Sequence, residues 1–273
     1  MRFSTLTQYA VVVSVMMLLS GCSLFFGSGS GKRDSGPPPG SVDVSKIPDA
    51  VPKVEPKSKC GNKAAYEVFG RRYRVLKSSR GFVEKGIASW YGKKFHGRQT
   101  ANCEKYDMYA MTAAHKNLPL PTYVEVTNLQ NGKKIVVRVN DRGPFHDNRI
   151  IDLSYVGASK LGMVGRGTAL VQVKAIDPRT YRRGGAPVSS RARKQSGNAS
   201  FYIQVGAFID RQNAYRLQRK LNALGSIRVT EAVMDAVRIY RVQIGPLTDV
   251  GVADNIVGLL GDYGIWEHRI ILK

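Results

Sequence analysis

The stretch Phe201-Tyr202-Ile203-Gln204-Val205-Gly206-Ala207-Phe208 has a second copy later in the chain, Tyr240-Arg241-Val242-Gln243-Ile244-Gly245-Pro246-Leu247. Apolar and polar side chains alternate in both copies, and this period of two predicts strands. Each copy precedes a helical apolar stripe and then a further expected strand, at 227–233 and at 265–272. The order predicts a small α+β domain of topology βαββαβ over 200–273, with both helices on one face of the sheet.

Capping residues bound the two expected helices. Asp210 is a candidate N-cap of the first helix, Gly225 its stop, and Gly264 stops the second. The open sheet face is expected to carry Tyr202, Gln204, Ile239, Arg241 and Gln243. Such groups suit a sugar chain or a nucleic-acid strand, and a merely solvated surface is the alternative. The segment resembles the SPOR domain, which binds peptidoglycan strands stripped of stem peptides, and the paired Gln-x-Gly runs carry that resemblance.

The region upstream reads as mostly β. Strands are expected at 86–90, 122–128, 134–140, 149–153 and 169–176, with a short helix at 154–161 capped by Ser154 and stopped by Gly162. Asn131-Gly132 lies between two apolar runs and is a hairpin signal. About six short strands around a Val, Ile and Leu core predict a small closed barrel.

Several strings in this region are similar to one known family. They are Ala88-Ser89-Trp90-Tyr91-Gly92, Thr100-Ala101-Asn102-Cys103-Glu104, Ala110-Met111-Thr112-Ala113-Ala114-His115, Leu118-Pro119-Leu120-Pro121, Val139-Asn140-Asp141-Arg142-Gly143-Pro144-Phe145 and Ile151-Asp152-Leu153-Ser154. Together they resemble the six-stranded double-psi β-barrel of the rare lipoprotein A family, whose members are outer-membrane lipoproteins with a C-terminal SPOR domain. Some members are lytic transglycosylases acting on stem-free glycan. The chain departs from the family pattern at Cys103, where Gly is usual.

Three side chains are the candidate catalytic groups. Asp141 follows a Val-rich strand and matches the barrel aspartate to which the family's catalysis is credited; the alternative is an aspartate that caps its own turn. Glu104 is the second candidate, the alternative being a solvated carboxylate. His115 could hold a carboxylate or a sugar hydroxyl, or be structural. Asp152 is expected to be a structural acceptor at the start of the helix that follows. Trp90 and Tyr91 are stacking candidates that could equally be core.

The chain begins with a segment typical of an exported lipoprotein. Arg2 precedes an apolar run at 10–19 that is too short to span a bilayer, which predicts a cleaved signal over 1–21. Leu19-Ser20-Gly21-Cys22 resembles the lipobox, so Cys22 is expected to carry a lipid anchor on the periplasmic side of the outer membrane; a secretory signal with a chance cysteine is the alternative. Residues 22–59 are predicted to form a flexible tether, because Gly, Ser and Pro dominate much of it.

Export also bears on the other cysteines. Once Cys22 is taken by lipid, Cys60 and Cys103 remain in an oxidising compartment, which predicts a disulfide between them; two free or intermolecular thiols are the alternative. The bridge would stabilise the fold by about 4 kcal/mol at most. It would connect the start of the 60–176 barrel domain to the loop that presents Glu104.

The chain is strongly basic, with 42 Lys and Arg against 20 Asp and Glu, and nearly all of the excess lies before Ser200. Export argues against nucleic acid as the partner and favours anionic cell wall or an acidic lipid surface. Residues 177–199 are expected to be a basic linker. Neither a metal site nor a cofactor is expected, since the histidines show no ligand spacing and no phosphate-binding glycine motif is present.

These features predict a lytic transglycosylase. The resemblance implies cleavage of the MurNAc–GlcNAc β-1,4 bond of glycan strands lacking stem peptides, with 1,6-anhydroMurNAc ends, at the division septum. The substrate's own hydroxyl attacks in such a reaction, so one carboxyl can serve as acid and then as base. The rival interpretation is an expansin-like protein that binds peptidoglycan without cutting it and is localised by its SPOR domain. Divisome proteins are possible further partners.

Overall fold

The structure is a computed structural model that describes residues 34–38, 40–146, 148–181 and 200–272. The expected signal, Cys22 and most of the expected basic linker lie outside the described residues. Among the described residues, no helix has the length and apolar character needed to cross a membrane.

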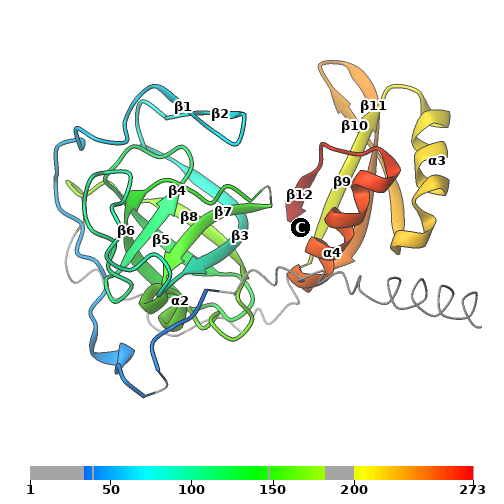
Figure 1. The fold of residues 1–273 in the computed structure, drawn as a ribbon. Helices are drawn as coiled ribbons and strands as arrows, with labels where there is room; N and C mark the ends of the chain where they lie inside the picture. Colours follow the sequence, from blue (N-terminus) through cyan, green and yellow to red (C-terminus); the bar gives the residue numbers. More distant parts are fainter. Residues whose placement is uncertain (1–33, 39, 147, 182–199, 273) are drawn as a thin grey trace, which may run out of the picture. The chain divides into compact units, whose positions relative to one another are not determined.

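Six strands close into a barrel, as predicted (Figure 1). They are β3 (Val83–Tyr91), β4 (Thr112–His115), β5 (Thr122–Asn128), β6 (Lys134–Asp141), β7 (Arg149–Ser154) and β8 (Ala169–Ala175). Their order around the barrel is β3-β7-β4-β6-β5-β8, with β3/β7 and β4/β6 parallel and the other pairs antiparallel. Strand β4 was not among the predicted strands, because four residues of sequence Thr-Ala-Ala-His carry little apolar alternation.

The barrel interior is filled by the alternate side chains of its strands. Val124 and Val126 of β5 and Ile135, Val137 and Val139 of β6 are at most 2 % exposed. Helix α2 (Tyr155–Leu161) packs its buried face on this core and has the expected caps. Ser154 accepts the Gly157 N–H at its N-terminus, and Gly162 adopts a left-handed conformation with φ 74° after its end.

A β-bulge determines where Asp141 points. Ala113 of β4 pairs with Val139, but the next residue, Ala114, pairs with Asp141, so Asn140 is the extra residue. In an uninterrupted strand, Asp141 would share the inward face of Val137 and Val139, because side chains alternate. The bulge breaks that alternation and brings Asp141 to the outer side of the barrel wall.

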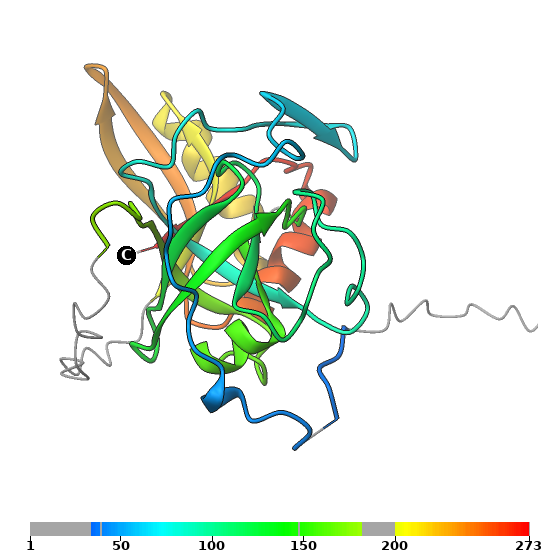
Figure 2. The same ribbon diagram turned by 90° about the vertical axis from the view of Figure 1, so that its left-hand side faces the viewer.

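Residues 34–59 do not behave as the predicted tether. Asp34 accepts hydrogen bonds from the Gly92 and Lys94 N–H groups at 2.6 and 3.0 Å. Asp49 accepts one from the Val136 N–H at 2.9 Å and pairs with Lys160. We call residues 49–60 the strap, which runs along the barrel in Figure 2. The prediction of a mobile segment is therefore wrong for this part, because its carboxylates find specific partners on the barrel.

The strap ends in the disulfide between Cys60 and Cys103, whose Cα atoms are 5.8 Å apart. Cys103 has φ 70°, a left-handed conformation that favours glycine, so the glycine usual in the family suits this position. After the strap, β1 (Ala65–Val68) and β2 (Arg71–Arg74) form a separate antiparallel hairpin. Stacking of Tyr66 on Tyr73, with ring centroids 5.3 Å apart, joins its two strands.

The C-terminal domain has the predicted βαββαβ order. Strands β9 (Phe201–Phe208), β10 (Ile227–Met234), β11 (Val237–Leu247) and β12 (Arg269–Leu272) form an antiparallel sheet of order β10-β11-β9-β12, and helices α3 (Arg211–Lys220) and α4 (Val250–Leu260) supply apolar side chains to its core. Asp210 caps α3 as expected. Several boundaries differ from the prediction: α3 ends at Lys220, before the 3-10 turn Asn222–Leu224, β11 already begins at Val237, and β12 begins only at Arg269.

Candidate active site

One row of side chains crosses four neighbouring barrel strands. Ser89 of β3 pairs with Asp152 of β7, Asp152 with Ala114 of β4, and Ala114 with Asp141 of β6. Residues paired across a sheet point to the same face, so all four side chains project from one side of the barrel wall. Ala114 is buried and separates the two carboxyl-bearing residues in this row. The register thus places Asp152 and Asp141 in one acidic strip that no single stretch of sequence contains.

Asp141 is held by the backbone through one oxygen. Its Oδ1 accepts the Ala101 N–H and the Arg142 N–H, each at 2.7 Å, and within the described residues Oδ2 has no hydrogen bond. Burial raises the pKa of Asp141 above the ordinary carboxyl value, although the two N–H groups and the Arg142 charge oppose the rise. A fixed carboxyl with one free oxygen and a raised pKa is suited to donate a proton.

Glu104 lies on the tight loop whose Ala101 N–H binds Asp141. Arg138 Nη1 donates to both Glu104 oxygens, at 3.0 and 2.8 Å, and Asn140 Nδ2 donates to Oε2 at 3.0 Å. Burial alone would raise the pKa of Glu104, but the hydrogen bonds from Arg138 and Asn140 lower it below its ordinary range. The lowered pKa favours the ionised form of Glu104, whose side chain is 45 % exposed.

Asp152 has a more prominent place than the sequence indicated. It does not cap α2, since Ser154 does; its Oδ1 instead accepts a short hydrogen bond from Ser89 Oγ. Burial raises the pKa of Asp152, opposed by the Ser89 bond. Gly143 has φ 138°, a conformation that other residues rarely adopt, and a Cβ there would be in ordinary contact with Asp152 Oδ2 at 3.9 Å. Asp152 thus belongs to the same acidic strip as Asp141.

His115 is part of the scaffold in this geometry. Its residue is 1 % exposed, its Nδ1 accepts the Asn117 and Leu118 N–H groups at 3.1 Å each, and its Nε2 lies 3.3 Å from Glu84 Oε2. Burial lowers the pKa of His115, while Glu84 opposes the shift. Both ring nitrogens are occupied by groups outside the acidic strip. The carboxylate that His115 contacts is that of Glu84, outside the acidic strip, and the geometry favours the structural alternative, in the turn after β4.

The two stacking candidates are also mainly structural. Tyr91 is 8 % exposed and stacks on Tyr106 at 4.0 Å between ring centroids. Burial raises the pKa of its hydroxyl well above the ordinary value, with the charges of Asp141 and Asp152 adding to the rise and a hydrogen bond with Thr112 opposing it. Trp90 is half-buried and meets Tyr155 edge to face. Tyr91 thus places a buried hydroxyl near Thr112 and near both carboxyl groups.

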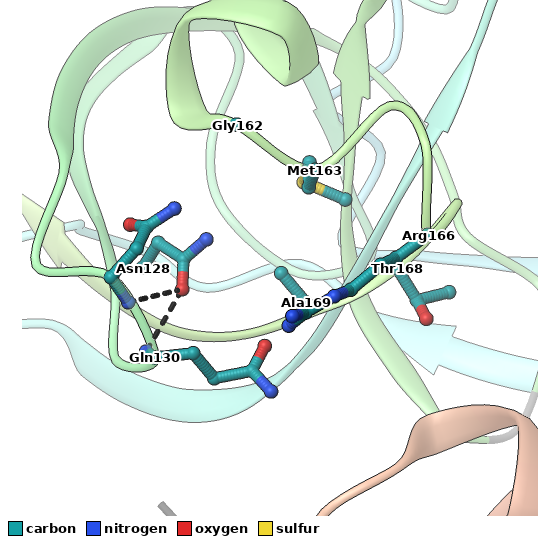
Figure 3. A pocket seen from close by; sticks show the side chains of 8 residues that line it. Asn128, Gln130, Gly162, Met163, Arg166, Thr168 and Ala169 are labelled. Atoms are coloured by element: carbon teal, nitrogen blue, oxygen red, sulfur yellow. Dashed lines mark hydrogen bonds between the residues drawn. The ribbon is translucent and has the colours of Figure 1, made fainter. Parts of the chain in front are cut away.

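A polar pocket of about 170 Å³ lies elsewhere on the barrel (Figure 3). Asn128 and Ala169 line it together with the loop residues Gln130, Asn131, Gly162, Met163, Arg166 and Thr168. Asn128 is at the end of β5 where β6 begins, whereas Asp141 is where β6 ends. The pocket is therefore at the opposite end of the barrel wall from Asp141.

The C-terminal sheet assembles a second candidate site. Its register forms a row of Arg228, Gln243, Gln204 and Arg269 across the four strands. Gln243 receives hydrogen bonds from Arg228 at 3.0 and 2.8 Å and donates to Gln204 at 3.4 Å. The Arg228 guanidinium lies 3.4 Å above the Tyr202 ring. Arg241 is in the neighbouring row, opposite Thr230 and Ala207.

Sequence reasoning found Tyr202, Gln204 and Gln243 but missed the two arginines at the ends of the row. Arg228 and Arg269 come from the strands outside the repeated pair, and the sequence does not reveal the register between strands. In the barrel, the same limit hid the proximity of Asp141 and Asp152. An alternating pattern predicts a face, while the pairing decides which faces meet.

The fold and these two sites define a class of protein: a double-psi barrel with an acidic strip, followed by a SPOR domain. Residues 83–173 match the family described as "Lytic transglycolase", and residues 197–261 match the family described as "SPOR domain".

Several curated proteins are similar over most of the chain. "Endolytic peptidoglycan transglycosylase RlpA" of Vibrio cholerae is 44 % identical over 236 residues, which is 86 % of each chain. The protein of that name from Pseudomonas aeruginosa strain UCBPP-PA14 is 40 % identical over 81 % of this chain and 78 % of its own. The one from Neisseria meningitidis serogroup B is 44 % identical over 73 % of this chain and 80 % of its own. The chain belongs to the RlpA family.

Proposed function

We propose that this chain is a peptidoglycan lytic transglycosylase that cleaves the β-1,4 bond between MurNAc and GlcNAc in glycan strands lacking stem peptides. The observation that carries the proposal is the pair of unlike carboxyl groups on one loop and strand end. Asp141 has a raised pKa and a free oxygen, whereas Glu104 is held ionised. The names of the relatives, endolytic peptidoglycan transglycosylases, support the same reaction.

The reaction needs no water. Protonated Asp141 Oδ2 gives its proton to the O4 atom of the leaving GlcNAc as the C1–O4 bond breaks. The O6 hydroxyl of the MurNAc then attacks C1, and the Asp141 carboxylate accepts the O6 proton. The products are a free 4-hydroxyl and a 1,6-anhydroMurNAc end. Glu104, being ionised, stabilises the positive charge that develops at C1 in the transition state.

The C-terminal sheet binds the glycan. Two amides flanked by two arginines suit the hydroxyls of sugars and the lactyl carboxylates of MurNAc, which are free where stem peptides have been removed. We extend the proposal to location: lipid on Cys22 holds the chain at the periplasmic face of the outer membrane, and the SPOR domain gathers it at the division septum. The lipobox and the SPOR match support this part.

Turnover of denuded glycan by wild type and three variants tests the assignment. Asp141→Asn should lose turnover by about 100-fold or more, the usual contribution of a positioned acid, while still binding glycan. Glu104→Gln should also be strongly impaired. Asp107→Asn, which changes an exposed carboxylate outside the strip, is the control and should match wild type. Cleavage by Asp141→Asn at the wild-type rate would remove Asp141 from the mechanism. Binding without any cleavage by wild type would favour the expansin-like alternative.

A further inference from the structure

Arg138 of β6 holds a carboxylate on each side of its guanidinium group. Its Nη1 donates to Glu104, while Nε donates to Glu55 Oε1 at 3.0 Å and Nη2 to Glu55 Oε2 at 2.9 Å. The donors of a guanidinium lie in one plane in a fixed fork, so the paired contact with Glu55 sets the rotation of the whole group. Glu55 comes from the strap and is 83 residues from Arg138 in sequence.

We propose that Glu55 is a positioning residue of the active site, which turns Arg138 so that its Nη1 faces Glu104. Glu55 is then the strap residue that supports the active site, whereas Asp49 attaches the strap to Val136 and Lys160 of the barrel domain. This inference rests on the proposed function only in giving Glu104 a role in the reaction. The positioning of Glu104 itself can be measured without any turnover.

The side chains of Arg138, Glu55 and Glu104 differ in how far they are exposed to solvent. The side chain of Arg138 is 18 % exposed and that of Glu55 is 20 % exposed, whereas Glu104 is 45 % exposed. The shielded pair is thus Glu55 and Arg138, and Glu104 is the carboxylate that reaches solvent and substrate. A shielded ion pair next to an exposed carboxylate is the arrangement expected if Glu55 and Arg138 position Glu104.

Glu55 is itself fixed in its ionised form. Tyr123 Oη donates to Glu55 Oε1 at 2.5 Å, and Lys53 adds a positive charge nearby. Burial alone would raise the pKa of Glu55, but the hydrogen bonds from Arg138 and Tyr123 lower it. The charged and titratable groups around this assembly are therefore Arg138 from β6, Glu55 and Lys53 from the strap, and Tyr123 from β5.

The strap does not need Glu55 to stay attached. On one side Asp49 binds the Val136 N–H and pairs with Lys160. On the other side the Ser58 N–H donates to the Leu120 carbonyl oxygen at 2.9 Å, and the disulfide at Cys60 follows. None of these contacts involves Arg138. Asp49→Asn therefore loosens the strap without touching the Glu104 assembly, and it is the matched control for Glu55→Gln.

The direction in which the Glu104 pKa moves in Glu55→Gln distinguishes a positioning role of Glu55 from a purely electrostatic one. In Glu55→Gln the amide N–H₂ faces the guanidinium N–H groups, so only one acceptor remains and Arg138 is free to turn. Glu104 then loses hydrogen bonds, and its pKa should rise. Removing the negative charge of Glu55 without any turning would do the opposite, because a neighbouring like charge raises a carboxyl pKa.

The experiment follows the Glu104 carboxyl carbon by NMR through an acid titration, in the purified protein and in both variants. We expect a higher Glu104 pKa in Glu55→Gln and no change in Asp49→Asn. On denuded glycan, kcat should fall roughly tenfold or more in Glu55→Gln with little change in KM, since misplacing a reacting group by about 1 Å can cost on the order of a hundredfold. The acid limb of its pH profile should move to higher pH.

Three results would overturn the proposal: an unchanged Glu104 pKa in Glu55→Gln, a lowered one, or an equal rise in Asp49→Asn. A raised pKa with unaltered turnover would instead show that Glu104 is positioned but not used. Full turnover by Glu104→Gln would establish the same point independently. Failure of the inference and failure of the proposed function are thus distinguishable.

Discussion

The two candidate catalytic residues, Asp141 and Glu104, differ in the donors and charges that surround their carboxyl groups. Among the described residues, Asp141 accepts hydrogen bonds from backbone N–H groups on one oxygen. It also faces the charge of Arg142, whose guanidinium nitrogens donate to the backbone oxygens of Gly61, His115 and Leu118. Glu104 faces a guanidinium directly. Burial therefore prevails at Asp141 and raises its pKa, while the ion pair prevails at Glu104 and lowers its pKa.

This difference predicts a bell-shaped pH profile of kcat. Activity should fall as pH rises through the raised pKa of Asp141, because the acid must be protonated, and fall as pH decreases through the lowered pKa of Glu104. Glu104→Gln should lose the acid limb and keep the alkaline one in its residual activity. An alkaline limb that persists unchanged in Asp141→Asn would contradict the assignment.

The same shift has a consequence for stability that serves as a check on folding. A carboxyl with a raised folded-state pKa favours folding while protonated, and this advantage is lost as pH rises through that pKa. Asp141→Asn should therefore have a higher Tm than wild type at neutral pH, and the gain should shrink as the pH falls from the raised pKa of Asp141 to the ordinary carboxyl value. A lower Tm at neutral pH would mean that the variant disturbs the barrel.

Among the elements, those with strong alternation or clear caps were predictable. β5 and α2 occur where expected, because alternating Val residues and the Ser154 and Gly162 caps specify them locally. The bulge at Asn140 was not predictable, since it exists only through pairing with β4. The strap was missed for a related reason: its Gly- and Pro-rich surroundings indicate a tether, whereas Asp49 and Glu55 have partners more than eighty residues away.

The disulfide that ends the strap gives a prediction for the catalytic loop. Replacing both cysteines by serine should lower the free energy of unfolding by up to about 4 kcal/mol. The pair Cys60→Ser with Cys103→Gly should be more stable than the double serine variant by about 1 kcal/mol, because φ 70° at position 103 strains any side chain. Urea unfolding measures both. Equal stabilities would show that the left-handed conformation is released once the bridge is gone.

On the scale of the whole molecule, the chain combines a catalytic barrel domain and a peptidoglycan-binding SPOR domain. The excess of basic residues lies before Ser200, yet the sheet row of the SPOR domain ends in arginines on both sides. The family resemblance predicted both domains and their order, and the domain matches agree with it. Which surface residues act together came only from the sheet registers.

Glycan binding by the SPOR domain can be tested separately from cleavage. Arg228→Ala removes both hydrogen bonds to Gln243 and the contact over Tyr202, so binding to denuded glycan should weaken about tenfold, the loss expected from one charge-assisted contact. Arg238→Ala changes an arginine at the far end of β10 and β11 and should bind normally. Retained septal enrichment of an Arg228→Ala reporter fusion would argue against this surface.

The central claim is that the barrel cuts glycan with the substrate's own hydroxyl. The most direct test is mass spectrometry of denuded glycan digested in ¹⁸O-labelled water. We predict fragments that end in 1,6-anhydroMurNAc with no ¹⁸O at the new end, formed by wild type and not by Asp141→Asn. Fragments with reducing ends that carry ¹⁸O would identify a hydrolase and contradict the mechanism, and intact glycan after incubation with wild type would contradict cleavage altogether.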